Sequence, residues 1–179
     1  MPDALIWVDD EGGYPDKLDE LSRLADELSL PTHASEQCRS ACRYLATVLA
    51  ALIPGENRRV APSPDWKPLL ILNDIKPLHP LIREIAQGSF LAKQPPAIQG
   101  SGRVVRSLEA ALWAFHDADN FEEAVLRAVN LGDDADTTGP ICGQLAGAFW
   151  GESQIPGLLR SGLARMDMLE NALASTLSR

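Results

Sequence analysis

The sequence predicts an all-α protein, and three observations lead to that prediction. Apolar residues recur at helical spacing along most of the chain, Ala and Leu are abundant, and only 6% of the 179 residues are aromatic. Sheets usually recruit aromatic and β-branched residues, and no segment here alternates as a strand does. With 45% hydrophobic residues the chain can bury a substantial core, so we expect residues 1–179 to form a single domain.

Two helices are expected in the first third of the chain. The apolar positions of residues 16–29 share one face of a helix, which Pro31 ends. Ser35 is suited to cap the next helix, because its hydroxyl can accept a hydrogen bond from a backbone N–H of the first turn. The apolar stripe of that helix runs over residues 38–52 and stops before the Pro54-Gly55 break.

The middle of the chain gives a weaker pattern, and the last part a strong one. Five prolines between residues 61 and 80 leave only short turns around residues 69–72. Residues 81–92 are expected to form one helix. The remaining helices are expected over residues 104–115 and 121–130, from the 131–137 loop to about residue 150, and over residues 159–177.

The charge and the cysteine content exclude several classes of function. A formal net charge of -9 and a pI of about 4.7 oppose binding to nucleic acid, and the basic residues form no run. No apolar stretch reaches the roughly 18 residues of a membrane span. Three cysteines, an odd number, without a secretory signal predict a cytoplasmic protein. Cys38 and Cys42 lack zinc-ligand spacing.

The most informative stretch is residues 132–151. Three carboxylates stand close together in it and are followed by Thr137 and Thr138; they belong to Asp133, Asp134 and Asp136. The next helix is nearly free of charge, and its glycines recur every fourth residue at Gly139, Gly143, Gly147 and Gly151. Such a row lets another backbone approach closely, although each glycine costs about 0.5–1 kcal/mol relative to alanine. The pattern predicts a buried, closely packed helix.

The carboxylates at the start of this helix admit three interpretations. Asp134 or Asp136 could cap the helix while the others are solvated. Asp134 and Asp136, with the Thr137 hydroxyl, could instead hold a divalent cation through the hard oxygen ligands that Mg²⁺, Mn²⁺ and Ca²⁺ prefer. A calcium loop of the EF-hand type fails, because Leu145 occupies the position of the required bidentate Glu.

The stretch AVNLGDDADT, residues 128–137, with the glycines that follow it, resembles the C-terminal signature of ADP-ribosylglycohydrolases. Residues 107–114, SLEAALWA, resemble the helix that precedes this signature in the family, and Thr32-His33 resembles the family's central Thr-His segment. The resemblance extends from about residue 16 to about residue 160. It implies a compact orthogonal helical bundle of the ADP-ribosylglycohydrolase type, here truncated.

The resemblance also implies a function, the metal-dependent removal of ADP-ribose from a modified side chain or a small molecule. Family members bind two Mg²⁺ or Mn²⁺ ions, and the metal ligands implied here are Asp134, Asp136 and Thr137. The ions would orient ribose hydroxyls and the water that attacks the anomeric carbon. The implied substrate-binding residues are His33 and Gly102, with Arg103 at a position where an aromatic residue is common and where a guanidinium could pair with a phosphate.

The departures from the family limit these expectations. Family members carry an N-terminal half with a Thr-Asp-Asp metal motif and an acidic residue near the reacting ribose, and no part of this chain matches that half. Asp9-Asp10 follows Val8 and is expected to be a solvated acidic stretch. No catalytic residue is therefore assigned, and at most one weak metal site is expected. The expected partners are ADP-ribose or an ADP-ribosylated substrate, and either a complementing N-terminal half or a second copy. A non-catalytic nucleotide-binding module and an inactive remnant remain the alternatives.

Overall fold

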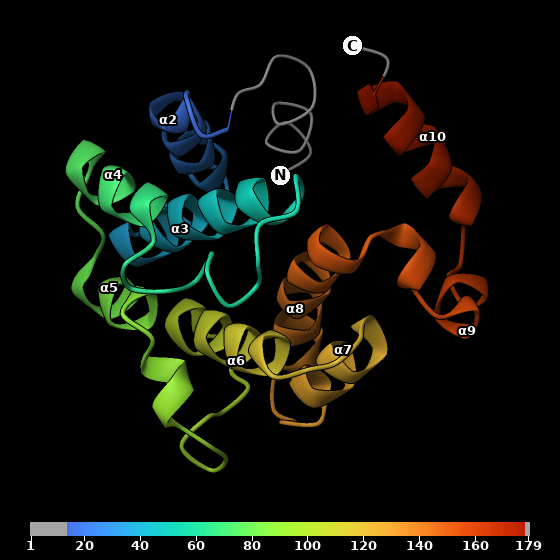
Figure 1. Cartoon of the computed structure of the whole chain (residues 1–179). Helices are drawn as coiled ribbons and strands as arrows, with labels where there is room; N and C mark the ends of the chain where they lie inside the picture. The colour runs from blue at the N-terminus through green and yellow to red at the C-terminus, as the bar shows by residue number, and fades with distance from the viewer. Residues whose placement is uncertain (1–13, 178–179) are drawn as a thin grey trace.

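The computed structural model describes residues 14–177, and every regular element in that range is a helix (Figure 1), which confirms the all-α prediction. Asp9-Asp10 lies outside the described residues. The α-helices are α2 (Leu18–Ser29), α3 (Glu36–Leu52), α4 (Lys67–Ile75), α5 (Pro80–Ala86), α6 (Val104–His116), α7 (Phe121–Val129), α8 (Ala135–Trp150), α9 (Gly157–Ser161) and α10 (Met166–Leu177). Two 3₁₀ turns, η1 (Ser89–Ala92) and η2 (Glu152–Gln154), lie between them.

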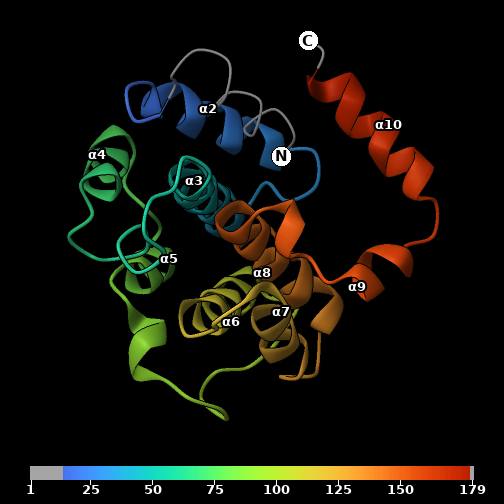
Figure 2. The same ribbon diagram turned by 45° about the vertical axis from the view of Figure 1, so that its right-hand side comes forward.

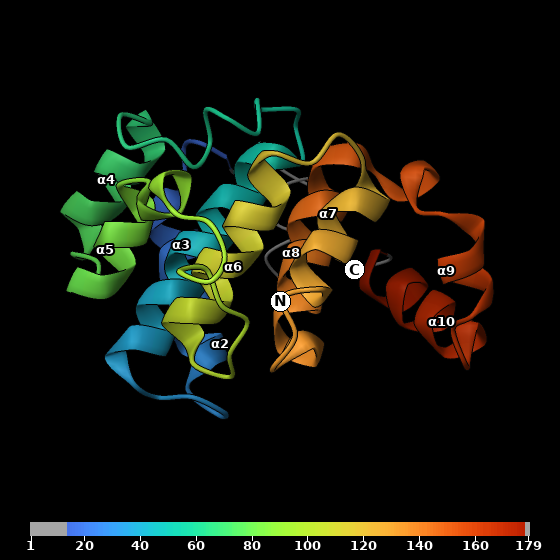
Figure 3. The same ribbon diagram turned by 90° about the horizontal axis from the view of Figure 1, so that it is seen from below.

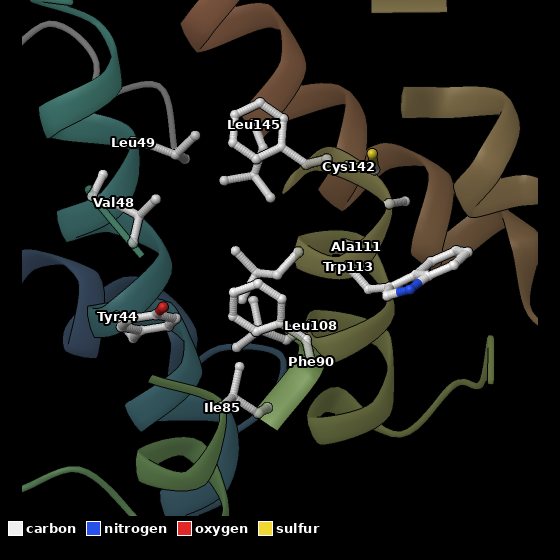
Figure 4. Close-up of a cluster of buried hydrophobic side chains, with 14 of the residues drawn as sticks. Tyr44, Val48, Leu49, Ile85, Phe90, Leu108, Ala111, Trp113, Cys142 and Leu145 are labelled. Atoms are coloured by element: carbon white, nitrogen blue, oxygen red, sulfur yellow. The ribbon is translucent and has the colours of Figure 1, made fainter. Parts of the chain in front are cut away.

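Helix α6 is the centre of the fold. It packs against α3, α7 and α8, and all of residues 107–115 are buried. Figure 4 shows side chains of α3, among them Val48 and Leu49, facing Leu108 of α6 and Leu145 of α8 across the core. Burying side chains of this size contributes about 1.5–3 kcal/mol each. Packing around α6 therefore fixes how α3 and α8 lie relative to each other.

The helix starts follow the expected capping chemistry. The Ser35 hydroxyl accepts a hydrogen bond from the Cys38 backbone N–H at 3.3 Å, which confirms Ser35 as the cap of α3. The Asn120 side chain accepts from the Glu123 N–H at 2.9 Å and caps α7 in the same way. Within residues 14–177 no helix is long and apolar enough to span a bilayer.

Three expectations about helix boundaries are wrong, each for a local reason. Residues 67–75 form the helix α4 instead of short turns, because Pro68 lies in the first turn, where a missing N–H costs nothing. The helix expected over residues 81–92 is divided into α5 and η1 by Gly88, whose φ of 86° is left-handed. The last expected helix is interrupted at Gly162, which separates α9 from α10.

The glycine row of α8 is only partly packed as expected. A Cβ atom added to Gly139 would lie 2.9 Å from a methyl group of Val129 in α7, so this glycine does permit close packing. A Cβ atom added to Gly143 or Gly147 would meet nothing within 4 Å. The side of α8 that carries Cys142 and Leu145 is buried, whereas Gly143 and Gly147 border an open groove between α3 and α8 in the part of the chain that the structure describes.

A cluster of charged side chains joins α2, α3 and α4. The Asp26 carboxylate accepts hydrogen bonds from Arg43 at 2.7 Å, from Lys76 at 3.3 Å and from Arg39. The Arg43 side chain is only 1% exposed and also donates to the Pro77 backbone carbonyl at 3.2 Å. Burial raises the pKa of Asp26, but the hydrogen bonds from the three cations outweigh it and lower the pKa to about 2.

This cluster predicts a loss of stability in acid. A carboxylate with a depressed pKa stabilises the fold above its unfolded pKa of 3.8, and that contribution disappears as the pH falls towards about 2. We expect about 2 kcal/mol of the free energy of unfolding to be lost in this window, as measured by urea denaturation at a series of pH values. Asp26→Asn is expected to flatten the dependence, and Asp65→Asn, at an exposed carboxylate, is the control. An unchanged pH profile for Asp26→Asn would contradict the assignment.

The buried hydroxyl of Tyr44 predicts a stabilising substitution. Tyr44 is fully buried in the core (Figure 4), its hydroxyl has no hydrogen-bond partner among the described residues, and burial raises its pKa. An unpaired buried hydroxyl costs about 1–3 kcal/mol. We expect Tyr44→Phe to raise the melting temperature, whereas Tyr14→Phe, at a half-buried tyrosine whose ring stacks on Trp66, should not. A lower melting temperature for Tyr44→Phe would mean that the hydroxyl is paired in solution.

Candidate functional site

The acidic loop between α7 and α8 is built on two residues with left-handed backbone. Gly132 has a φ of 73° and Asp133 a φ of 53°. Asp tolerates this conformation better than most residues other than glycine, through local hydrogen bonding of its short side chain. The turn reverses the chain after α7 and places Asp134 immediately before α8.

Asp134 occupies the N-cap position of α8, but its side chain does not cap the helix. The backbone carbonyl of Asp134 accepts instead, from the N–H of Thr137 at 3.2 Å and from the N–H and hydroxyl of Thr138 at 3.1 and 3.2 Å. Capping is therefore not the role of the Asp134 carboxylate. It stays available to a ligand.

The structure brings the three predicted metal ligands together. The Asp134 carboxyl group lies close enough to the side chains of Asp136 and Thr137 for both to affect its pKa. The neighbouring Asp136 carboxylate raises the pKa of Asp134, and the Thr137 hydroxyl opposes that effect. Two carboxylates held side by side favour either a shared proton or a cation between them.

A second loop, residues 100–103, lies directly against the acidic loop. A Cβ atom added to Gly102 would stand 2.6 Å from Oδ2 of Asp134, and one added to Gly100 would stand 2.5 Å from the Gly132 carbonyl oxygen. The Ser107 hydroxyl of α6 donates to the carbonyl oxygens of Ser101 and, at 3.0 Å, Arg103. Helix α6 thus holds Gly102 next to the Asp134 carboxylate.

A cavity of about 270 Å³ opens beside these loops, between α2, α3 and the start of α8. Its lining includes His33, Gly102 and Thr137, so three of the predicted site residues meet around one space. The His33 segment is fixed by the Ser29 hydroxyl, which donates to the His33 carbonyl oxygen at 2.7 Å. The remaining lining is mixed polar and apolar, and none of the described residues that line this cavity is Asp or Glu.

Arg103 is not among the residues that line this cavity. It is exposed at the N-terminus of α6, and its backbone N–H donates to the Ser101 hydroxyl at 3.3 Å. Its contact with a phosphate stays a prediction. The sequence interpretation missed two other residues, Cys38 and Cys42, which line the cavity as free thiols. Their spacing of one helical turn directly after Thr32-His33 was the available signal.

The predicted metal ligands have the right chemistry for a hard divalent cation, but there are too few of them to complete its coordination. Asp134, Asp136 and Thr137 offer carboxylate and hydroxyl oxygens, which suit Mg²⁺ or Mn²⁺. Mg²⁺ requires six ligands, and in the part of the chain that the structure describes no group of three or more His, Cys, Asp or Glu side chains could hold a metal ion. These residues can form one open side of a metal site, with the other ligands coming from water or from elsewhere.

The two glycines of the 100–103 loop predict different effects of substitution. Gly100→Ala would force a backbone oxygen aside, and we expect it to lower the free energy of unfolding by about 1–3 kcal/mol. Gly102→Ala displaces only the end of the Asp134 side chain, so it should leave stability nearly unchanged and weaken Mn²⁺ binding several-fold. Urea denaturation and Mn²⁺ titration of both variants test this contrast. Equal effects on stability would contradict the geometry.

Comparison with known proteins assigns the chain to a class. The family model of the ADP-ribosylglycohydrolases matches residues 6–179, a longer stretch than the 16–160 expected. A chain of a solved ADP-ribosylglycohydrolase-related protein complex superposes with a TM-score of 0.77 at 34% identity, over 96% of this chain and 56% of its own length. The fold is therefore that of an ADP-ribosylglycohydrolase-related protein, and the chain belongs to the ADP-ribosylglycohydrolase family.

Three relatives of the chain have names that state an activity. An ADP-ribosylarginine hydrolase, Tri1, of Serratia proteamaculans (strain 568) is 37% identical over 147 residues, which are 82% of this chain and 38% of that protein. The protein of the same name from Pseudomonas putida (strain GB-1) is 36% identical over 70% of this chain and 31% of its own length. An ADP-ribosyl-[dinitrogen reductase] glycohydrolase of Rhodospirillum rubrum is 36% identical over 75 residues. The chain thus spans well under half the length of the curated relatives that it matches.

Proposed function

We propose that this chain supplies one side of the active site of an ADP-ribosyl hydrolase and that the other side comes from residues outside it. The observation that carries the proposal is the cluster of Asp134, Asp136 and Thr137 at the mouth of a cavity that also holds His33 and Gly102. The names of the relatives, ADP-ribosylarginine hydrolase and ADP-ribosyl-[dinitrogen reductase] glycohydrolase, support this class of reaction.

Each residue has a role that follows from its chemistry. Asp134, Asp136 and Thr137 would hold a Mg²⁺ or Mn²⁺ ion, which when bound supplies charge stabilisation and a template for ribose hydroxyls and water. His33 lines the cavity, and its imidazole can donate a hydrogen bond to a phosphate of ADP-ribose. Gly102 lets the 100–103 loop lie close to Asp134, so that a nucleotide in the cavity and a cation at the carboxylates would be neighbours.

The hydrolysis itself adds water to the anomeric carbon as the bond to the modified group breaks, and the leaving group takes up a proton. A carboxylate near that carbon usually assists this step. The described residues that line the cavity include no carboxylate, and we assign no catalytic residue. The isolated chain is proposed to be inactive and to need the remainder of the fold.

The same observation supports a second candidate function. A cavity with hydroxyls and an imidazole but no lining carboxylate suits the binding of ADP-ribose or a related nucleotide without its cleavage. Such a module would bind its ligand through His33 and its neighbours, and would not depend on a cation at Asp134 and Asp136.

Calorimetric titration of ADP-ribose into the chain, with Mn²⁺ and then with excess chelator, separates the two functions. The hydrolase proposal predicts weak binding that chelator abolishes. It also predicts that Asp134→Asn lowers Mn²⁺ affinity at least about tenfold. Asp133→Asn is the matched control, because it removes a charge from the same loop while Asn tolerates the left-handed backbone.

Binding that persists in chelator would favour the nucleotide-binding module. A folded chain that binds neither Mn²⁺ nor ADP-ribose would overturn both candidate functions and leave only family membership.

A further inference from the structure

Two free thiols, those of Cys38 and Cys42 in α3, line the cavity that His33 and Thr137 also line. Each is half-buried, so a small reagent in the cavity can reach it. Figure 2 shows α2 lying along α3, and Figure 3 shows the starts of α3, α6 and α8 at one edge of the bundle. The cavity lies at that edge, because Cys38, Val104 and Thr137 belong to the first turns of these three helices. We refer to Cys38 and Cys42 as the thiol pair.

The spacing of the thiol pair opposes a direct disulfide bond. Cys38 and Cys42 are four residues apart within α3, so their side chains lie on one face of the helix. Cβ atoms at this spacing are about 5–6 Å apart, whereas a disulfide requires about 3.5–4.5 Å. An S–S bond would require the start of α3 to unwind, and the Ser35 hydroxyl, which accepts from the Cys38 N–H at 3.3 Å, holds that turn in place.

A centre that binds both sulfur atoms at once suits this spacing better. An atom inserted between the two sulfur atoms lengthens the link by one bond, so the helix can stay intact. Burial raises the pKa of the Cys42 thiol, and the neighbouring Cys38 raises it further, which is the effect of a second sulfur close by. Thiolate sulfur is a soft ligand and selects soft centres.

Zinc does not suit the thiol pair. Structural zinc sites take four protein ligands, usually Cys and His. Within residues 14–177 no group of three or more His, Cys, Asp or Glu side chains could hold a metal ion, so His33 does not complete a ligand set with the two thiols. The bound centre must therefore be satisfied by two protein sulfur atoms. Trivalent arsenic in an organic arsenical is such a centre, because carbon already occupies its third valence.

We propose that Cys38 and Cys42 form a dithiol site that captures trivalent arsenicals and thereby closes the cavity to a nucleotide. With an arsenoxide, two As–S bonds form, the bond between arsenic and oxygen breaks, and the oxygen leaves as water with the two thiol protons. Arsenic stays trivalent and neither sulfur is oxidised, so the step needs no oxidant or reductant. The capture depends on the thiol pair alone, whereas the loss of nucleotide binding rests on the proposed function.

The closure of the cavity follows from its size and lining. The space is about 270 Å³, and its apolar lining residues include Leu28 and Ile141, against which an organic group on the arsenic can pack. Arsenic bound to the thiol pair and its substituent would occupy volume that a nucleotide beside His33 needs. Capture and nucleotide binding are therefore expected to exclude each other.

Intact-mass spectrometry of the reduced chain treated with phenylarsine oxide tests the capture. We expect the wild-type chain to form a single adduct that survives excess glutathione, a monothiol, because two sulfur atoms of one chain reach the same arsenic at a high effective concentration. Dimercaptopropanol, a dithiol, should remove the adduct. Cys38→Ser and Cys42→Ser should each lose it in glutathione, since one thiol alone competes poorly.

Cys142→Ser is the matched control, because it makes the same change at the third cysteine of the chain. Cys142 is fully buried, and its thiol donates to the Ala124 carbonyl oxygen at 3.2 Å, a hydrogen bond that a serine hydroxyl can also make. We expect this variant to keep the glutathione-resistant adduct. Cys42→Ala replaces Cys42→Ser if circular dichroism shows that the serine variant does not fold.

Calorimetric titration of ADP-ribose into treated and untreated chain tests the closure of the cavity. We expect the adduct to lower the affinity for ADP-ribose at least about tenfold, and bound ADP-ribose to slow formation of the adduct, because mutual exclusion is reciprocal. The treated Cys38→Ser variant should bind ADP-ribose as its untreated form does.

Several results would contradict the proposal. A folded wild-type chain without a glutathione-resistant adduct, or a single-serine variant that keeps one, would overturn the dithiol site. A Cys38–Cys42 disulfide formed by diamide in the folded chain would overturn the spacing argument. An adduct that leaves ADP-ribose binding unchanged would overturn the closure of the cavity. An untreated chain that binds no ADP-ribose would refute the proposed function and the closure, whereas the adduct would still establish the dithiol site.

Discussion

The burial of α6 is the constraint on which the candidate site depends. Nine consecutive residues, Ser107–Phe115, are removed from solvent, because α3, α7 and α8 pack around this one helix. The Ser107 hydroxyl at the start of that buried run holds the 100–103 loop, and the loop in turn lies against Asp134. The 100–103 loop and Asp134, which are distant in the sequence, therefore lie side by side because both are positioned by packing around α6.

The backbone of the acidic loop leaves the Asp134 carboxylate free of a capping role. A helix N-terminus would ordinarily recruit the Asp134 carboxylate as a cap, but the Thr138 hydroxyl and two backbone N–H groups bond to the Asp134 carbonyl oxygen instead. The carboxylate is left beside that of Asp136, and their mutual repulsion is relieved by a proton or a cation. The repulsion within the acidic pair and the metal binding proposed for it thus arise from the same arrangement of side chains.

Much of the fold, and part of the site, could be predicted from the sequence. Periodicity and caps located α2, α3, α6, α7 and α8, because each of these helices buries one regular face or begins at a capping side chain. Helix α4 was missed because proline ends a helix or begins one according to its position, which periodicity does not reveal. Asp134, Asp136 and Thr137 are neighbours in sequence and could be grouped directly, whereas the contact between Gly102 and Asp134 depends on tertiary packing.

The exposure of helix α10 is expected to make the C-terminal part of the chain sensitive to proteases. A helix of 12 residues is marginal in water on its own, and none of residues 166–175 is buried, so local unfolding there costs little free energy. Proteases cut at such segments first, and the exposed residues 162–165 between α9 and α10 offer the entry point. The larger product would keep His33, Gly102 and the acidic loop, so trimming would remove α10 and leave the candidate site residues in place.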